Sequence, residues 1–520
     1  MRAKLSFILC AIVAVPALSD TIRVPGDYPT IQAGINAARK GDTVLVADGV
    51  WTGDENKNLD FHGKPITVRS ENGPENCIID CEGKGRGFRF HRYERAKSVV
   101  EGFTITGGNK GGIYCRYSKP RIVYCTITGN KADEGGGIYC YYSDLTIANC
   151  TIMGNATRKA GNGGGICCYA NSFPTITDCT ITGNKAGDDG YGGGIFCDDG
   201  FPTITHCAIA GNTAGGFGGG ICCHHSFSKI TNCTITKNTA CYGGGGICCG
   251  WYDSKAIIAN CTIIGNMTSG DGGGIQCISY CDSTITSSTI AGNTAGSAGG
   301  GICCVQDSNA TITNSTITGN TASYDGGGIH CSYASNSTIT NCALTENTAR
   351  SDGGGIKCSG SAVKIVNSAI ARNTAYYGGG GISCSENYSI ITNCTITGNM
   401  ARHEGGGIHC WYSTLRIANC ILWGDTPDEI YVETGDPVVS YSDVQDGWPG
   451  ANNIDADPLW VSGPLGDYYL SHKRAGQPKN SPCRNAGLGT AKGLGLKKFT
   501  TRTDGKKDRR AVDMGYHYPR

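Results

Sequence analysis

Short alternations of apolar and polar residues, interrupted by Gly, Asn or Ser, fill most of the chain. Residues 192–212 show the pattern clearly, as the runs "GGGIFC", "PTITH" and "CAIAGN". Period-two alternation is typical of strands with one buried face, and it places Ile195 and Cys197 on the same face. Helical periodicity is absent from these runs, so each unit is predicted to form three short strands.

The same unit recurs at a nearly fixed interval. The isoleucine after each Gly-Gly pair returns every 25 to 29 residues, and self-similarity at such a period indicates a solenoid. A coil of short strands buries its apolar face by pairing in parallel with the next coil. We therefore predict an all-β chain, a right-handed parallel β-helix solenoid with three short strands in each of about twelve regular coils, its handedness following that of parallel crossovers. The repeat isoleucines are Ile113, Ile138, Ile166, Ile195, Ile221, Ile247, Ile275, Ile302, Ile329, Ile356, Ile382 and Ile408.

The two ends of the chain depart from the repeat. Residues 1–19 have the basic start, the apolar run and the small cleavage-site residues of a secretion signal, and the run is too short to span a membrane. Residues 20–100 are predicted to be an N-terminal cap with irregular coils, residues 101–424 the regular repeats, and residues 425–520 an irregular tail. The mature chain is expected to be monomeric, without a transmembrane segment, and either secreted or associated with the cell surface or outer membrane.

The cap begins with a predicted helix. In "YPTIQAGINAARKGDTVLVADGVW", Ile31, Ile35 and Ala38 lie on one face of a short amphipathic helix, and Gly41 is a suitable end. A helix laid over the open end of the solenoid would shield its unpaired strands from other chains.

Cysteine and asparagine follow the repeat as well, in a chain with 31 Cys. A cysteine stands two residues after every repeat isoleucine, and a second cysteine column is replaced by serine in three coils while the first is kept. Both columns are therefore interpreted as small buried side chains stacked in register, and the Asn of each "GN" unit as an amide ladder. Cys222 and Cys248 face outward on adjacent coils, so this pair is predicted to form a surface disulfide.

The charge balance narrows the possible partners. The formal net charge is +1, which excludes a strong electrostatic attraction to nucleic acid or to an anionic membrane. The glycines belong to the coil repeat and not to a phosphate-binding loop, so no organic cofactor is expected.

Two acids and two imidazoles occupy equivalent offsets in neighbouring coils. Asp198 and Asp199 follow the first strand of one coil, and His224 and His225 follow the first strand of the next. If the coils stack in register, these four side chains come together as candidate catalytic residues. Such a group suits acid–base chemistry or a divalent metal, and the identity of a metal stays open.

Aromatic residues recur at the corners of the coils. Rings along an elongated surface suit stacking against sugars or contact with a protein, because they give a rigid contact area. We select five of them, Tyr169, Trp251, Tyr252, Trp411 and Tyr412, as candidate carbohydrate-binding residues. The other corner aromatics are Tyr117, Tyr142, Phe201, Phe227, Tyr280 and Tyr333.

Three segments resemble known families. The phrase "DYPTIQAGINAA…GDTVLVADGVW" resembles the start of pectate-lyase-like and pectin-esterase-like β-helix proteins. The Gly-Gly-x-Ile and Asn units resemble bacterial right-handed parallel β-helix repeat proteins and the passenger repeats of chlamydial polymorphic outer-membrane proteins. The tail "NNIDADPLW…DYYLS…NSPCRNAG…TDGKKDRRAVDMGYHYP" resembles the C-terminal segment of exported bacterial β-helix proteins. These resemblances imply a pectate-lyase-like fold and export.

Three functional hypotheses stay open. The first is an exported binding or adhesion module for polysaccharide or a surface partner. The second is a polysaccharide lyase or glycoside hydrolase, with Ca²⁺ as a possible cofactor of a lyase, although the sequence motifs of lyases and pectin esterases are not visible. The third is an ice-binding protein, suggested by outward Thr pairs such as Thr175 and Thr177, although Thr is also a good strand former.

Overall fold

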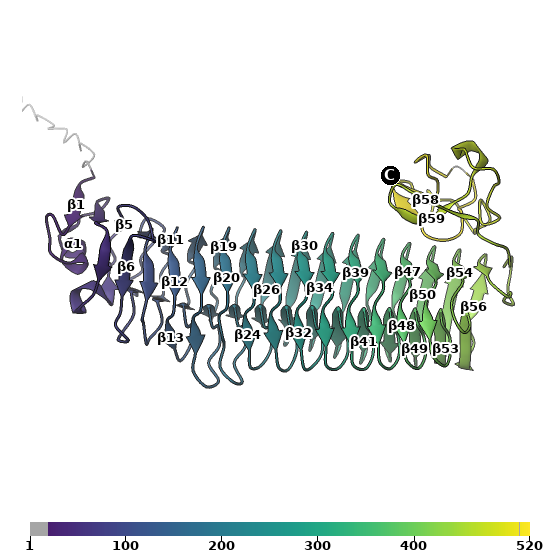
Figure 1. Cartoon of the computed structure of the whole chain (residues 1–520), viewed down its shortest axis with the longest axis horizontal. Coiled ribbons are helices and arrows are strands. Elements are labelled where there is room, and N and C mark those ends of the chain that lie inside the picture. The colour runs from purple at the N-terminus through teal and green to yellow at the C-terminus, as the bar shows by residue number, and fades with distance from the viewer. Residues whose placement is uncertain (1–18, 509) are drawn as a thin grey trace, which may run out of the picture.

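The computed structural model describes residues 19–508 and 510–520 as a long parallel β-solenoid with a small lobe near its C-terminal end (Figure 1). The expected secretion signal lies outside the described residues except for its last position. The solenoid is right-handed, and its strands pair in parallel with their counterparts one coil further on. For example, Ile195 lies beside Ile221 and Cys197 beside Cys223.

One coil from the middle of the rod shows the local organisation. It contains β21 (Ile195–Asp198), β22 (Thr203–Thr205), β23 (Ala208–Ala210) and β24 (Thr213–Ala214). The first three strands are the predicted ones. The fourth has only two residues and recurs in eight successive coils. It was not predicted because a Thr-Ala dipeptide is too short to show alternation.

The rod has more turns than the repeat suggested. The sheet that runs from β3 (Gly49–Trp51) to β57 (Asp443–Val444) contains 16 strands, one for each turn. The prediction of about twelve coils was therefore wrong in number. The early turns were missed because other apolar residues stand in the isoleucine column: Phe88 pairs with Ile113 on one side and with Leu59 on the other.

The interior is one continuous apolar column. The repeat isoleucines and both cysteine columns are buried, and the cysteines of the described residues are all free, which confirms stacked small side chains without cross-links. The amide ladder is present too: Asn184 Nδ2 donates to Asn212 Oδ1 over 3.0 Å and to the Ile152 carbonyl over 2.9 Å. Each coil thus repeats its neighbour because its buried groups find their partners there.

The N-terminal end carries the predicted helix. Helix α1 (Ile31–Ala37) buries Ile31 and Ile35, and the Thr30 side chain accepts a hydrogen bond from the Ala33 amide. It ends before Gly41, because Ala38 already has extended backbone angles.

The C-terminal tail folds back onto the last coils of the rod (Figure 1). Asn367 Nδ2 donates to the His517 carbonyl over 2.9 Å, and the His517 amide donates to Asn367 Oδ1 over 2.8 Å. The lobe also contains β58 (Trp460–Gly463) paired with β59 (Gly466–Leu470). Among the described residues, no helix has the length and apolar character needed to cross a membrane.

Candidate ligand-binding surfaces

Asp198, His224 and His225 form a compact cluster at one corner of the rod. Asp198 ends β21 and lies in register beside His224, which ends β25 (Ile221–His224). His224 Nδ1 lies 2.7 Å from Asp198 Oδ1, and His225 Nδ1 lies 3.3 Å from the same oxygen. The equal offsets in adjacent coils thus bring these three side chains together, as the sequence predicted.

Two opposing effects act on the pKa of the Asp198 carboxylate. Burial raises it, but the hydrogen bonds and positive charge of His224 and His225 outweigh burial and hold the pKa of Asp198 below its ordinary value. The carboxylate therefore accepts hydrogen bonds from both rings as an anion at neutral pH. The three groups also offer one oxygen and two nitrogens within 4.8 Å of one another, a set that suits a divalent cation.

Asp199 does not join this cluster. It sits in a tight turn at φ +53° and is exposed, and its Oδ2 accepts from Asn171 Nδ2 over 3.4 Å. The prediction that both acids face both imidazoles was wrong, because the Asp199 side chain lies toward Asn171 of the preceding coil and not toward the histidines of the next one. The cluster consequently has one carboxylate, whereas glycoside hydrolysis commonly uses two.

Two of the selected aromatic residues serve packing. The Tyr169 hydroxyl accepts from Asn162 Nδ2 over 2.7 Å and lies 3.3 Å from Glu134 Oε2. Trp251 packs against the His224 ring at a centroid distance of 4.6 Å. Both rings are half-buried and cover the outer face of the sheet, so neither offers a free sugar platform.

The rings also explain what happens to Cys222 and Cys248. These residues are register partners on adjacent coils, as expected, but both side chains are fully buried and both thiols are free. Tyr191, Phe217 and Trp251 pack over them. The surface disulfide is therefore not present, because an aromatic cover turns the outward-facing pair into a second small apolar cluster.

Tyr252 belongs to an exposed strip at the corner. Its ring is 69% exposed and stacks on His225 at 5.8 Å and on Tyr280 at 6.3 Å. We call His225, Tyr252 and Tyr280 the corner strip. The other selected pair lies at the far end of the rod, where Tyr412 is exposed and packs edge-on against Trp411 at 5.2 Å.

A second strip of rings lies two residues further along the chain. Phe173, Phe201 and Phe227 stack with centroid distances of 5.0 and 5.1 Å, and each is 42 to 45% exposed. We call these three residues the Phe strip. Phe173 was missed as a corner aromatic, although Phe follows the coil corner in three consecutive copies, as "SFPT", "GFPT" and "SFSK".

The Phe strip leads into a shallow groove of about 530 Å³ on the adjoining sheet face. Lys229 and Lys255 line this groove together with Ile257, which is 50% exposed. The Lys255 ammonium lies 5.9 Å from the centre of the Phe227 ring. The two ammonium groups and the Ile257 side chain thus extend the candidate binding surface from the Phe strip into the groove.

Buried polar residues on the outer side of the first strands were also missed. We call the residues directly after the repeat isoleucines the outer column, because they point away from the core and are covered by the loops before the strands. Lys357 in this column is 6% exposed, and its ammonium donates to Asp352 Oδ2 over 2.9 Å, Ser385 Oγ over 2.9 Å and Ser383 Oγ over 3.1 Å. From the N-terminal end, the outer column contains Tyr114, Tyr139, Cys167, Phe196, Cys222, Cys248, Gln276, Cys303, His330, Lys357, Ser383 and His409.

The two histidines of the outer column are nearly buried. His330 is 8% and His409 is 7% exposed, and burial lowers the pKa of both imidazoles. The signal was visible in the sequence, since "GICC" and "GIFC" units give way to "GIHC", "GIKC" and "GISC". The repeat did not point to these positions, because the residue between Ile and Cys varies from coil to coil while Ile and Cys are kept.

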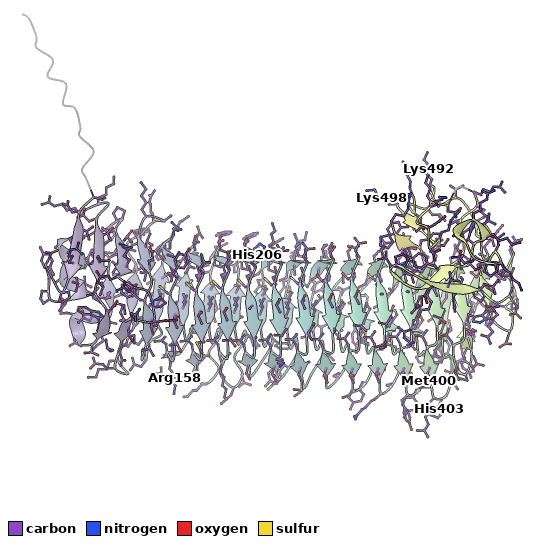
Figure 2. The ribbon with its side chains drawn as sticks, turned by 45° about the horizontal axis from the view of Figure 1, so that its top comes forward. Arg158, His206, Met400, His403, Lys492 and Lys498 are labelled. Carbon is purple, nitrogen blue, oxygen red and sulfur yellow. The ribbon has the colours of Figure 1, made fainter. Side chains whose placement is uncertain are left out.

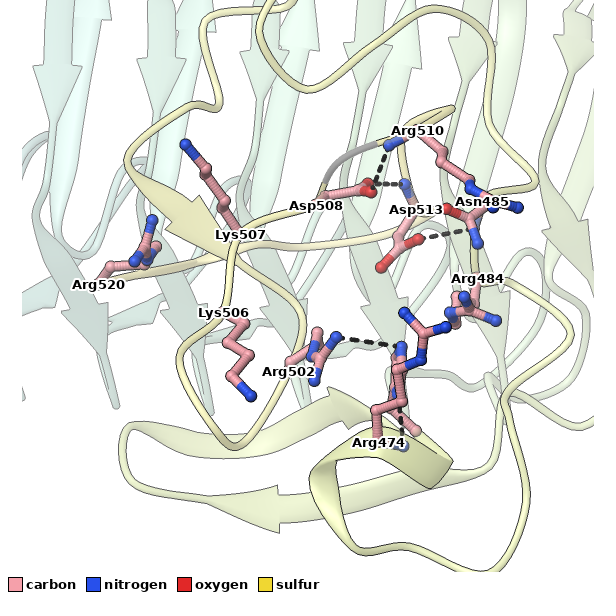
Figure 3. Close-up of a pocket in the computed structure, with 11 residues that line it drawn as sticks. Arg474, Arg484, Asn485, Arg502, Lys506, Lys507, Asp508, Arg510, Asp513 and Arg520 are labelled. Atoms are coloured by element: carbon pink, nitrogen blue, oxygen red, sulfur yellow. Dashed lines mark hydrogen bonds between the residues drawn. The ribbon is translucent and has the colours of Figure 1, made fainter.

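The tail lobe holds a hollow of about 520 Å³ lined mainly by basic side chains (Figure 3). Arg502 donates to Asp504 over 2.8 Å through Nε and lies 3.3 Å from His472 through Nη1. Further basic side chains, including Lys492 and Lys498, lie on the outside of the lobe (Figure 2). The basic residues of the hollow are Arg474, Arg484, Arg502, Lys506, Lys507, Arg510 and Arg520.

Comparison with known families agrees with the solenoid. The family model described as "Right handed beta helix region" matches residues 44–200 and 287–422. The model of the Chlamydia polymorphic membrane protein repeat matches residues 232–250. None of the curated proteins matches the chain.

Several solved structures are similar at low identity. The periplasmic alginate epimerase AlgG, as a double mutant, shares 11% identity over 76% of this chain and 86% of its own, with a TM-score of 0.33. The A-module of the Azotobacter vinelandii mannuronan C-5 epimerase AlgE6 shares 12% identity over 84% of this chain and 96% of its own, with a TM-score of 0.27. PfbA, a surface adhesin of Streptococcus pneumoniae, shares 9% identity over 85% of this chain and 94% of its own, with a TM-score of 0.18.

Proposed function

Because the chain belongs to the right-handed β-helix family, we propose that it is a binding module of the cell surface or extracellular space, which holds an acidic polysaccharide along one corner of the rod. The main support for this proposal is the pair of adjacent aromatic strips. The corner strip and the Phe strip each extend over three consecutive coils, so the exposed rings form one elongated surface.

Exposed phenylalanine is the informative part of this surface. Phe173, Phe201 and Phe227 have no polar group that would favour contact with water, yet each is 42% exposed or more. Contiguous exposed apolar groups on a protein surface mark sites of interaction. The rings stack on one another, so they offer their outer edges and the free faces at the ends of each strip. This linear arrangement fits an extended chain better than a compact ligand.

The charges beside the strips favour an acidic polymer. Lys229 and Lys255 stand where the Phe strip ends, and an ammonium binds carboxylate or sulfate groups as a point charge. A single acid, Asp282, lies in the same groove and is hydrogen-bonded to Asn309 over 3.1 Å. The basic hollow of the tail lobe offers a second attraction of the same sign.

A binding assay with a triple variant tests the proposal. Residues 20–520 would be titrated with one acidic polymer, such as a polyuronate, and with a neutral glucan. We expect binding of the acidic polymer, and Phe173→Ala/Phe201→Ala/Phe227→Ala should weaken it more than tenfold. The matched control is Tyr324→Ala/Tyr376→Ala, which removes rings that are 63% and 42% exposed in the loops before β41 (Ile329–Ser332) and β49 (Ile382–Ser385). Equal binding by the triple variant and the wild type would refute the proposal.

The same samples test the catalytic alternative, which rests on the 2.7 Å contact between Asp198 and His224. New chain ends would be measured after incubation with the polymers, with and without calcium. Cleavage that disappears in Asp198→Asn would replace the binding proposal with a lyase or hydrolase. Binding without cleavage would support the module proposed here.

A further inference from the structure

One histidine and two glutamates meet near the C-terminal end of the solenoid, away from the aromatic strips. His409 lies in β53 (Ile408–Ala418), Glu433 lies in β55 (Ile430–Gly435), and Glu404 lies in the loop before β53. His409 Nε2 is 3.6 Å from Glu404 Oε2 and 3.7 Å from Glu433 Oε2. One ligand-type atom from each side chain lies within 4.8 Å of the other two.

The imidazole is the unusual member of this group. Its side chain is 9% exposed, and Nε2 has no hydrogen-bond partner among the described residues. Separations of 3.6 and 3.7 Å exceed the range of a good N–H···O bond, which ends near ~3.2 Å. A buried polar atom without a partner costs roughly 1 to 3 kcal/mol. The nitrogen is thus aimed at two carboxylates that are close to it but not bonded to it.

The backbone brings the glutamates to this position. Cys410 pairs with Val432, whereas the next residue, Trp411, pairs with Thr434. Glu433 is therefore the extra residue of a β-bulge, a feature that commonly redirects a side chain. The ring of His409 also needs the glycine beside it, because a Cβ on Gly378 would lie 2.8 Å from His409 Nδ1.

We propose that Glu404, His409 and Glu433 bind a divalent transition-metal ion such as Zn²⁺, through His409 Nε2 and one oxygen of each carboxylate. Zinc bonds to nitrogen and oxygen of about 2.0 to 2.2 Å place tetrahedral ligand atoms roughly 3.4 Å apart, close to the two observed separations. A neutral imidazole and two carboxylates carry two negative charges, which match the charge of the ion. Imidazole ligands favour Zn²⁺ over Ca²⁺, which prefers oxygen alone.

The surroundings hold the ring in place. His409 Nδ1 lies 3.5 Å from Ser383 Oγ, which also accepts from Lys357 over 3.1 Å. The Tyr431 ring stacks on the imidazole at 5.8 Å. A hydrogen bond from the other ring nitrogen usually supports a metal-binding histidine, and Ser383 Oγ is the group placed to take that role, although 3.5 Å is longer than a good hydrogen bond. Because the Glu404 and Glu433 side chains are 42% and 52% exposed, the fourth ligand position faces solvent, where a water or a carboxylate of an incoming ligand can bind.

The cluster at the middle of the rod provides a comparison. There, Asp198 Oδ1 already lies within 2.7 Å of His224 and 3.3 Å of His225, so the three groups satisfy one another without an ion. At the C-terminal cluster the corresponding contacts are too long for hydrogen bonds. A metal is therefore expected at His409 in preference to Asp198.

Zinc titration of the mature chain tests this site. Residues 20–520 with Cys241→Ser, which removes the exposed thiol, would be titrated with Zn²⁺ by calorimetry and with Co²⁺ by absorption spectroscopy. We expect one ion per chain. Glu433→Gln should weaken binding more than tenfold, and His409→Asn/Glu433→Gln should abolish it together with the Co²⁺ bands. Glu433 is half-exposed, so its single variant should fold as the wild type does, which circular dichroism would verify.

The matched control is Asp198→Asn/His224→Gln, which should keep the full stoichiometry and affinity. Absence of Zn²⁺ binding by the parent protein would overturn the proposal. So would binding that survives in His409→Asn/Glu433→Gln or that is lost in the control variant.

Discussion

The outer column differs between the middle of the rod and its C-terminal part. In the middle of the rod, Cys222 and Cys248 lie under an aromatic cover and form an apolar cluster. In the C-terminal part, Lys357 and His409 occupy the equivalent positions and are also buried, but they are surrounded by serines and carboxylates. Parallel pairing and the inward Ile and Cys columns are the same in both places, except that a bulge shifts the register between β53 and β55 beside His409. The fold is therefore carried by the inward columns, and the outward position directly after each isoleucine is free to differ in chemistry.

The largest expected loss of stability comes from placing a charge in the apolar cluster around Cys222 and Cys248. Cys222→Lys buries an ammonium without a carboxylate partner, so it should lower the free energy of unfolding by about 3 to 5 kcal/mol. Urea unfolding followed by circular dichroism measures this change. Cys222→Ala is the control for lost volume and should cost much less. Equal stability of the two variants would mean that the apolar character of this cluster is not required.

The second-largest expected loss of stability comes from removing the buried positive charge of Lys357. Lys357→Met leaves Asp352 without the ammonium that lies 2.9 Å from it, and we expect a loss of about 2 to 3 kcal/mol. Lys357→Met/Asp352→Asn should recover most of that loss, because no charge is left unpaired. The same urea experiment compares the single and double variants. A double variant no more stable than the single one would show that the ion pair is not the stabilising contact.

Removing the aromatic cover should change thiol chemistry. Burial holds the pKa of the Cys248 thiol well above its ordinary value, so little thiolate forms at pH 8 and its reaction with a disulfide reagent is slow. In a Cys241→Ser background, Trp251→Ala should speed this reaction at least tenfold by admitting water to the cluster. Trp411→Ala, at the far end of the rod, is the control. Unchanged rates would show that Trp251 does not cover the thiols.

The smallest expected effect is electrostatic and depends on pH. The folded-state pKa of Asp198 is lowered, so its contribution to stability is present above the ordinary carboxyl pKa and is lost as the pH falls through the folded value. The side chain is partly exposed, so we expect the contribution to be below about 1 kcal/mol. Asp198→Asn should reduce the midpoint of thermal unfolding at pH 6, and the reduction should shrink as the pH falls below the ordinary carboxyl pKa. A difference that stays constant or grows as the pH falls would contradict this assignment.

Much of the solenoid could be predicted because its core is a repeat in sequence. Isoleucine and cysteine return in register, so strand pairing and burial followed from the period alone. The extra turns could not be counted in this way, because Phe88 and Leu59 fill the column without the glycine signature. The packing of the tail rests on contacts such as Asn367 with His517, which are far apart in sequence and leave no local pattern.

A candidate site could be predicted from the sequence only where its residues follow the coil repeat. Asp198 and His224 were found because they share an offset in adjacent coils. Asp199 shares the next offset, but its side chain lies toward Asn171 of the preceding coil. The cluster of His409 and Glu433 depends on a bulge that breaks the register, so no spacing rule points to it. Sites that depend on a local departure from the repeat can therefore be located only in the structure.

Footprinting of the aromatic strips tests the central claim, that outward positions along one corner carry the function. Hydroxyl-radical labelling would be measured at Phe173, Phe227 and Tyr252 with and without the acidic polymer, with Tyr324 as the reference residue. We expect the three strip residues to become several-fold less reactive while Tyr324 keeps its reactivity. Unchanged labelling of the strips in a sample that binds the polymer would contradict the account and place the binding surface elsewhere on the rod.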